Sequence, residues 1–303
     1  MFDFLVTGYI NMDLDGAASA YAYAEFLNKQ GKTAVAGIFG KLHQEAEFVF
    51  KQFKIEPLAN AAKMDYEEVV LVDASDAKWI DSRIRLGQVV AVFDHRQVNQ
   101  VFEFKRAKIQ IELVGAAATL VAEQFFESNV LMSVDTAKLL YLAIVSNTIN
   151  FKADVTTKRD VKVAERLFKI SGLPAGFVLK MFEYKSKFKH DLKTTMVEFT
   201  GINYSLSTGI VQLEILEADD FVKNNFDKIV LYLNQIKQEK KLDFIFLTCI
   251  DIGRGFNLIV AADKSSKKLV SDIFKVKFRD NITRFHNIIM RKQMWTLIKN
   301  KFE

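Results

Sequence analysis

Acidic residues, with one histidine among them, follow three short apolar runs in the N-terminal half of the chain. Asp13 and Asp15 come a few residues after the run at 4–6, Asp73 ends the run at 68–73, and Asp94 and His95 end the run at 89–95. Apolar runs with little alternation are typical of strands buried on both faces of a parallel sheet. Because the carboxyl ends of such strands share one edge, where ligands bind, we expect these side chains to lie close together.

This set of side chains could hold metal ions. Carboxylates with one imidazole and no thiolate favour Mn²⁺ or Mg²⁺ over a structural zinc. Two such ions about 3.5–4 Å apart would support hydrolysis of a phosphate ester or anhydride, and Asp73 could bridge them. A polar triplet at 146–148, after an apolar run at 139–145 that is either helix or strand, could contribute a further ligand. The simpler alternative is a helix cap, because Asp15 near the amino end of a helix is favourable without any function.

The elements that must position these residues alternate along the first half of the chain. The pattern predicts strands over 4–7, 34–37, 68–73 and 89–94, and helices over 17–29, 45–53 and 156–170. A threonine cap followed closely by Asp160 should begin the last of these helices. The alternation predicts an α/β fold with a doubly wound, mostly parallel sheet.

A second, smaller α/β domain is expected after a lysine-rich stretch at 179–190, which places the boundary near 186–193. We expect domains over 1–187 and 194–303. In the second, the pattern predicts strands over 197–199, 209–215, 244–250 and 256–262, and helices over 219–237 and 267–274. Arg291 and Lys292 are adjacent and lie between apolar residues near the end of the chain. The simplest interpretation of this pair is surface charge at the start of a helix.

Composition excludes several classes of protein. The 303 residues are 50% hydrophobic and include 27 Phe, enough for a large core. No uncharged apolar run reaches about 18 residues, so we expect no membrane span. The single cysteine, Cys249, excludes a disulfide within the chain, and the amino terminus lacks a signal-peptide pattern, so we expect a cytoplasmic protein. The net charge of +5 suits an anionic substrate, but the lysines are spread along the chain and we do not expect a nucleic-acid partner.

In order and spacing these residues resemble the DHH phosphoesterase superfamily, and within it the manganese-dependent (family II) inorganic pyrophosphatases and the prune-type exopolyphosphatases. The family motif Gly-His-x-Asn-Pro-Asp-x-Asp is similar to residues 8–15, its strand-end Asp to Asp73, and its Asp-His-His to 94–96. Its Val-Gly-Ala-Thr-Ala-Thr segment resembles 114–119, its Ser-Asp-Thr-x-x-Phe-Lys motif 146–152, and its C-terminal Ser-Arg-Lys-Lys-Gln element 290–293. The resemblance spans nearly the whole chain.

The resemblance implies a DHH-type metal-binding domain, a smaller substrate-binding domain, and an active-site cleft between them. It implies one or two Mn²⁺ (or Mg²⁺) ions and a small phosphorylated substrate such as pyrophosphate or short polyphosphate; a homodimer stays open. The implied metal ligands are Asp13, Asp15, Asp73, His95 and, more weakly, Asn147. The implied catalytic residues are Asp13, Asp73 and His95, and the implied substrate-binding residues are Arg96, Arg291 and Lys292.

The chain also departs from the family pattern. Tyr9 replaces the first-motif histidine, Asn147 replaces the fourth-motif aspartate, and Arg96 replaces the second histidine of Asp-His-His. Tyrosine, with a pKa near 10, is a poor ligand for Mn²⁺ at neutral pH. Arg96 could hold a phosphate but not act as a general acid. We therefore expect a phosphohydrolase with altered or reduced activity. The alternative is a catalytically inactive homologue that acts as a binding or regulatory protein for a phosphorylated ligand.

Overall fold

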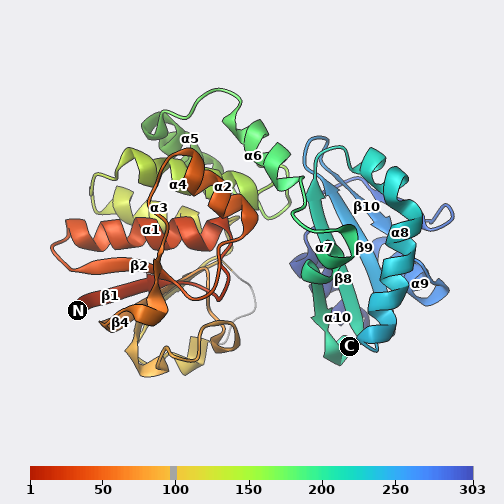
Figure 1. The fold of residues 1–303 in the computed structure, drawn as a ribbon, viewed down its shortest axis with the longest axis horizontal. Helices are drawn as coiled ribbons and strands as arrows, with labels where there is room; N and C mark the ends of the chain where they lie inside the picture. Colours follow the sequence, from red (N-terminus) through yellow and green to blue (C-terminus); the bar gives the residue numbers. More distant parts are fainter. Residues whose placement is uncertain (96–100, 303) are drawn as a thin grey trace. The chain divides into compact units, whose positions relative to one another are not determined.

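The computed structural model describes residues 1–95 and 101–302, which form two compact units. Unit 1 comprises Met1–Phe151 and Val155–Met181, and unit 2 comprises Lys152–Asp154 and Phe182–Glu303. Each unit has its own sheet and helices (Figure 1). Composition placed the change of domain near 186–193, whereas the longer segment of the second unit begins at Phe182, inside helix α6 (Phe177–Lys185). A continuous helix therefore carries the chain from one unit to the next.

Unit 1 is built on a parallel sheet whose strand order in the described residues is β3-β2-β1-β4-β5-β6. Every neighbouring pair in this order is parallel. The order reverses between β1 and β4, the position where doubly wound sheets bind ligands. The expected doubly wound sheet is thus confirmed. Its strands are β1 (Phe2–Thr7), β2 (Ala34–Ile38), β3 (Ala59–Asn60), β4 (Tyr66–Val72), β5 (Val89–Asp94) and β6 (Lys108–Ile111).

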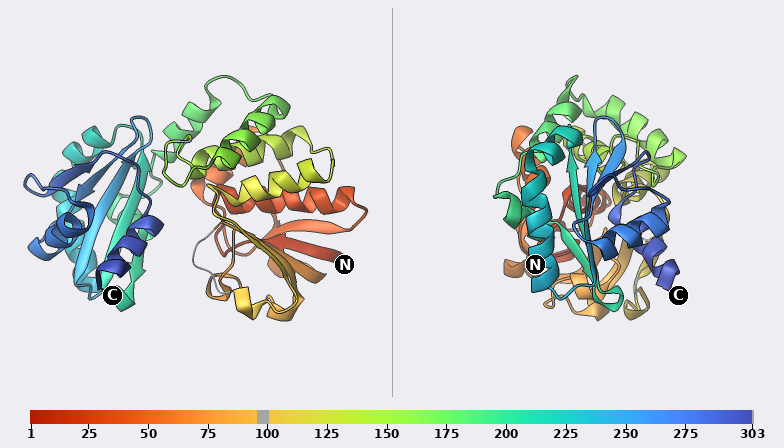
Figure 2. Two further views of the ribbon diagram at one scale, coloured as in Figure 1. Left: turned by 180° about the vertical axis from the view of Figure 1, so that it is seen from behind. Right: turned by 90° about the vertical axis from the view of Figure 1, so that its right-hand side faces the viewer.

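The α-helices of unit 1 lie on one face of this sheet, and the short 3₁₀ turns that follow β4 and β5 lie on the other, as both views from front and back show (Figures 1 and 2). They are α1 (Leu14–Lys29), α3 (Ala117–Glu127), α4 (Val134–Asn147) and α5 (Lys158–Ser171), with α2 (Gln44–Gln52) after β2. Helix α1 is rich in buried alanines, which let it pack closely against its neighbours. The apolar run at 139–145, left open between helix and strand, lies within α4.

Short 3₁₀ turns carry the crossovers between β4, β5 and β6. They are η2 (Ala77–Trp79), η3 (Leu86–Gln88) and η4 (Val101–Glu103). Around them Ile80, Ile84 and Phe104 are buried in one apolar cluster with Leu5 and Leu71 of the central strands. This cluster keeps water away from the sheet and fixes the ends of β1 and β4.

Unit 2 has a mixed sheet with the order β11-β10-β9-β8-β7. Strands β8 and β9 are parallel and the other pairs are antiparallel. Met196 and residues of α8 are buried in one apolar cluster, whereas residues of α9 and α10 are buried in another. The elements are β7 (Thr200–Asn203), β8 (Thr208–Ile215), α8 (Ala218–Glu239), β9 (Phe244–Asp251), β10 (Phe256–Val260), α9 (Lys264–Phe274), β11 (Ile282–Phe285) and α10 (Arg291–Phe302).

The strand expected over 197–199 is wrong, because Val197 and Glu198 belong to helix α7 (Leu192–Glu198). Asp191 caps this helix by accepting hydrogen bonds from the backbone N–H groups of Lys193 and Thr194. A side chain that satisfies the first amides favours a helix start. The cap therefore outweighs the short apolar pattern that suggested a strand.

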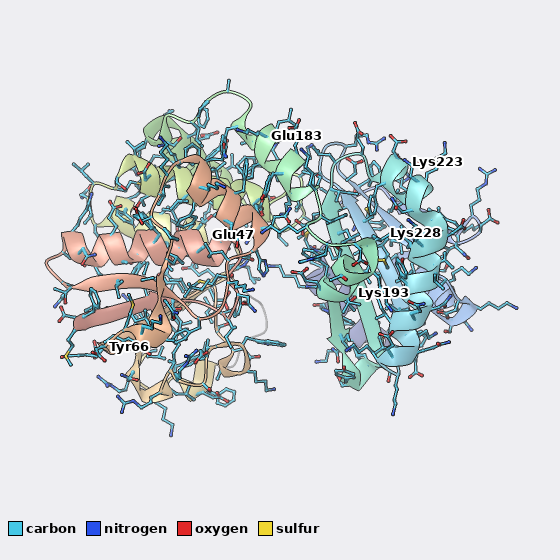
Figure 3. All side chains as sticks on the ribbon, viewed as in Figure 1. Glu47, Tyr66, Glu183, Lys193, Lys223 and Lys228 are labelled. Atoms are coloured by element: carbon cyan, nitrogen blue, oxygen red, sulfur yellow. The ribbon has the colours of Figure 1, made fainter. Side chains whose placement is uncertain are left out.

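Exposed lysines on helices account for part of the positive charge. Lys223 and Lys228, labelled in Figure 3, are exposed on α8. Among the described residues, no helix combines the length and apolar character needed to cross a bilayer.

Candidate metal centre

The loop between β1 and α1 brings the first two aspartates to the end of the sheet. At Gly8 a Cβ atom would lie 2.7 Å from the carbonyl oxygen of Val72, so the chain passes the end of β4 only without a side chain. Asp13 caps α1, since its Oδ1 accepts a hydrogen bond of 3.0 Å from the N–H of Gly16. The cap is therefore Asp13, which corrects the alternative that assigned this role to Asp15.

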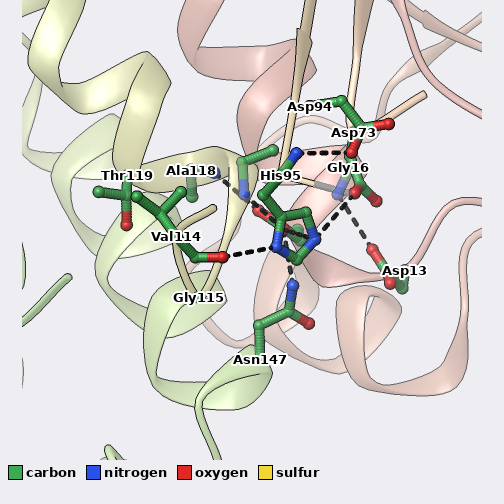
Figure 4. A network of polar contacts seen from close by, with 12 residues as sticks. Asp13, Gly16, Asp73, Asp94, His95, Val114, Gly115, Ala118, Thr119 and Asn147 are labelled. Carbon is green, nitrogen blue, oxygen red and sulfur yellow. Dashed lines mark hydrogen bonds and ion pairs between the residues drawn. The ribbon is translucent and has the colours of Figure 1, made fainter. Parts of the chain in front are cut away.

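Asp15 is buried in the first turn of α1 and accepts three hydrogen bonds (Figure 4). The backbone N–H groups of Ala117 and Ala118, at the start of α3, each donate at 2.8 Å. The side-chain amide of Asn147 donates to Oδ2 at 2.6 Å. Burial raises the pKa of Asp15 to about 8, and the Asp73 carboxylate adds to the rise while His95 opposes it. A cation at this point would offset the cost of the buried charge.

Asp73 follows β4 directly and has an unusual backbone. Its φ is 52°, in the left-handed region that non-glycine residues seldom adopt, and its side chain is buried. Its N–H donates to the carbonyl of Phe93 in the neighbouring strand at 2.7 Å. Strained conformations of this kind persist where the surroundings hold them and cluster at functional sites.

His95 follows β5, and its ring orientation is fixed by the backbone of another segment. Its Nδ1 lies 3.0 Å from the carbonyl oxygen of Val114. Because a carbonyl can only accept, Nδ1 carries the proton and Nε2 keeps its lone pair. Nε2 lies 3.4 Å from Asp73 Oδ1 and 3.8 Å from Asp15 Oδ2. These distances are too long for good hydrogen bonds but suit atoms that share a metal ion.

The preceding residue, Asp94, fixes the backbone of His95. One oxygen of its buried carboxylate accepts a hydrogen bond from the N–H of His95 at 2.6 Å. The other accepts from the hydroxyl of Ser75, in the loop after β4. Asp94 thereby connects the loop after β4 to the residue that follows β5.

Asp15, Asp73 and His95 together fit a divalent metal ion. One ligand atom from each lies within 4.8 Å of the others, and all three side chains are buried. Two carboxylate oxygens and one imidazole nitrogen are donors that suit a hard to borderline divalent ion. Asp13 is outside this group and caps α1, and Asn147 presents its amide nitrogen, rather than its oxygen, to Asp15. The structure thus gathers three of the five ligands expected from sequence.

The expected substrate-binding residues are placed differently. Arg96 lies outside the described residues. Arg291 begins α10 in unit 2, where its Nη1 donates to the carbonyl of Phe199 at 2.7 Å and its N–H donates to Gln212 Oε1 at 2.5 Å. Burial lowers the pKa of Arg291 while Glu214 opposes this, and a guanidinium stays protonated in either case. Lys292 is exposed beside it.

Sequence reasoning missed the contacts that hold the metal-binding side chains in place. They are made by the Val114 carbonyl, the Ala117 and Ala118 amides, and the carboxylate of Asp94. The available signal was the run of small residues at 115–118, because such a run lets a backbone approach other groups closely. Ala116, the residue just before α3, has no side-chain oxygen that could cap the helix.

Comparisons with known proteins found one family match, similar sequences and a similar fold. Residues 3–144 match the DHH family, N-terminal domain. The manganese-dependent inorganic pyrophosphatases of Methanothrix thermoacetophila and Bacillus subtilis are each 26% identical, over 95% of this chain and 94% and 95% of theirs. A crystal structure of a proposed family II inorganic pyrophosphatase from Methanococcus jannaschii shares the fold, with a TM-score of 0.78 and 23% identity over 98% of both chains.

Proposed function

We propose that the protein, whose residues 3–144 match the DHH family, N-terminal domain, is a manganese-dependent phosphohydrolase acting on pyrophosphate or short polyphosphate. The observation that carries the proposal is the buried group of Asp15, Asp73 and His95 at the point where the strand order reverses. The manganese-dependent pyrophosphatases similar to this chain over 95% of its length support the same substrate class.

Asp15, Asp73 and His95 of unit 1 would hold the ion, and backbone groups or backbone conformation orient each of these side chains. A divalent ion bound there supplies Lewis acidity and a water of lowered pKa. His95 would bind through Nε2, because Val114 fixes the proton on Nδ1. Asp15 is directed by the two amides of α3, and Asp73 by its left-handed backbone. We assign Asp13 to a second, weaker ion shared with Asp73.

The second unit would bind the phosphate groups. We assign residues 1–187 to metal binding and 194–303 to substrate binding. Arg291 and Lys292 of the second part, together with Arg96 of the first, would neutralise phosphate oxygens. A guanidinium has five N–H donors, and the contact with Phe199 uses one of those of Arg291. Charge-assisted hydrogen bonds to phosphate are typically worth about 1.5–3 kcal/mol each.

The test is phosphate release from pyrophosphate and tripolyphosphate with Mn²⁺ or Mg²⁺, together with calorimetric Mn²⁺ binding. Asp73→Asn should abolish both Mn²⁺ binding and hydrolysis, because it removes a charged ligand at the centre of the group. The matched control is Asp76→Asn, the same change in the same loop, where the carboxylate accepts from the N–H of Lys78. The proposal fails if Asp73→Asn binds Mn²⁺ as the parent does.

The contacts of Asn147 favour a second candidate, a homologue that binds a phosphorylated ligand without hydrolysing it. The amide of Asn147 donates to Asp15, where the related motif has an aspartate that would add a charged ligand. Metal content separates the two candidates. Two bound ions with phosphate release support the hydrolase, whereas phosphate binding with neither metal nor turnover supports the binding protein.

We also propose a homodimer that forms through strand β6. This strand lies at one end of the sheet order, and Ile109, Leu113 and Phe102 are exposed on or beside it. Light scattering should give twice the mass of 34.6 kDa, and Leu113→Glu should shift the mass toward that of the monomer. A monomeric parent at micromolar concentration would contradict the dimer.

A further inference from the structure

A buried aspartate on α5, Asp160, collects four donors from two segments of the chain. Within its own helix start, Asp160 Oδ2 accepts from the N–H and the hydroxyl of Thr157, at 2.7 and 2.6 Å. From the other segment, Oδ2 accepts from the N–H of Gly115 at 2.9 Å and Oδ1 accepts from the hydroxyl of Thr119 at 2.6 Å. The side chain is fully buried.

A helix cap explains only half of these contacts. In a capping box the acidic side chain reaches back to the N-cap residue, here Thr157, and needs no further donor. The bonds to Gly115 and Thr119 join α5 to a segment about 40 residues earlier in the chain. Asp160 therefore does more than begin its own helix.

The segment that Asp160 holds is the one that directs two of the metal-binding side chains. The carbonyl of Val114 accepts a hydrogen bond from His95 Nδ1, and the N–H groups of Ala117 and Ala118 donate to the carboxylate of Asp15. Figure 4 shows Val114, Gly115, Ala118 and Thr119 next to His95 and Asn147. A shift of this short segment would move both ligand contacts at once.

The packing leaves this segment little room. A Cβ on Gly115 would lie 2.5 Å from Cγ2 of Thr148 and 3.1 Å from Cγ of Asp160. The backbone of Gly115 thus lies between Asp160, near the start of α5, and Thr148, with no room for a side chain. Without the two bonds to Asp160, only steric contact would fix the position of Gly115. The N–H of Gly115 and the hydroxyl of Thr119 would then no longer be held in a set direction.

We propose that Asp160 is a positioning residue of the metal centre, which acts through residues 114–119 to orient His95 and Asp15. The proposal rests on the proposed function, since it assigns a purpose to the same metal group. Hydrogen bonds that orient a metal ligand are typically worth about 10–100-fold in metal affinity or activity. Asp160 acts one step further away, and we expect an effect near the lower end of that range.

The experiment separates positioning from helix capping with variants of two of the three partners of Asp160, Thr119 and Thr157. Thr119→Val removes a hydroxyl that binds Asp160 and keeps the side-chain shape, and Thr119→Ser keeps the hydroxyl. Thr157→Ala removes the cap and leaves the contacts with Gly115 and Thr119. For each variant, melting temperature, Mn²⁺ affinity by calorimetry and the NMR signal of the His95 Nδ1 proton in metal-free protein are measured.

We expect Thr119→Val to weaken Mn²⁺ binding about tenfold and to shift or broaden the His95 Nδ1 proton signal. Thr119→Ser should restore both to the values of the parent. Thr157→Ala should lower the melting temperature with Mn²⁺ affinity and the His95 signal unchanged. Asp160→Asn should combine both losses if it folds.

Two outcomes would overturn the proposal. One is a Thr119→Val variant with the Mn²⁺ affinity and His95 signal of the parent. The other is equal weakening in Thr119→Val and Thr157→Ala, which would mean that only the stability of α5 matters. Failure of the parent to bind Mn²⁺ would count against the proposed function instead, and the metal-free His95 signal would then decide the role of Asp160.

Discussion

At the scale of single residues, the pKa of Asp15 links the metal centre to pH. Burial, with the nearby Asp73 carboxylate, raises this pKa from 3.8 to about 8. A group whose pKa is raised by folding stabilises the fold fully below its unfolded pKa and loses that contribution as pH rises through the folded pKa. The metal-free protein should therefore become less stable between about pH 4 and pH 8.

Urea unfolding at a series of pH values checks this expectation. Asp15→Asn should flatten the profile in that window, because the amide cannot ionise. Saturating Mn²⁺ should flatten it as well, since a bound cation replaces the proton. A parent whose stability rises steadily from pH 4 to pH 8 would show that Asp15 is ionised in the metal-free fold.

Substitution of Asn147 should show how charge at the site affects the stability of the protein and its binding of Mn²⁺. Asn147→Asp puts a carboxylate where the amide now lies 2.6 Å from Asp15 Oδ2. Two carboxyl groups at this distance cannot both ionise without strong repulsion, so the metal-free pair must hold a proton in place of a cation. The metal-free variant should melt at a lower temperature than the parent, whereas Mn²⁺ should bind more tightly and raise its melting temperature more.

The matched control for this variant is Asn150→Asp, which adds the same charge at an exposed position of the same segment. It should change the melting temperature by the equivalent of less than about 0.5 kcal/mol and leave Mn²⁺ binding unchanged. If Asn147→Asp behaved like this control, Asn147 would have no place in the metal centre.

At the scale of elements, the centre depends on how closely the ends of β1 and β4 approach. Gly8 passes the carbonyl of Val72 where a Cβ would lie at 2.7 Å. Gly8→Ala should cost about 1–3 kcal/mol of unfolding free energy and weaken Mn²⁺ binding, because the loop that carries Asp13 and Asp15 must shift. Unfolding in urea with and without Mn²⁺ measures both effects.

Gly87 provides the control for this substitution. A Cβ there would have no neighbour within 4 Å, and its φ is not in the left-handed region. Gly87→Ala should be neutral or slightly stabilising, since alanine restricts the unfolded chain more than glycine does. Equal losses in the two variants would mean that the approach of β1 to β4 is not tight.

At the scale of the whole molecule, the two units should respond to different ligands. Asp15, Asp73, His95 and Asn147 all belong to unit 1, whereas Arg291 and Lys292 belong to unit 2. Hydrogen exchange should show Mn²⁺ alone protecting amides of unit 1, above all near 73, 95 and 114–118. Added phosphate should extend protection to the start of α10. Protection of α10 by Mn²⁺ alone would contradict this division of roles.

The sequence by itself determined the parallel sheet and the place of the ligands along the chain. Apolar runs ending in Asp73 and in Asp94-His95 specify buried strands with acids at their carboxyl ends, because periodicity and strand polarity are local properties. The same local logic predicted a helix over 156–170 with a threonine cap and Asp160 close behind; the structure has α5 there, with Thr157 as the cap and Asp160 completing a capping box. It failed at 197–199, where a side-chain cap outweighed the apolar pattern.

Only the tertiary structure decided which side chains act together. The pattern of residues 13–15 could not show that Asp13 caps α1 while Asp15 turns inward to the amides of α3, since those amides come about 100 residues later. Nor could it show that Asn147 presents its nitrogen to Asp15, or that Asp160 holds the segment between them. Hydrogen bonds between distant segments depend on packing in three dimensions, and no local pattern in the chain encodes them.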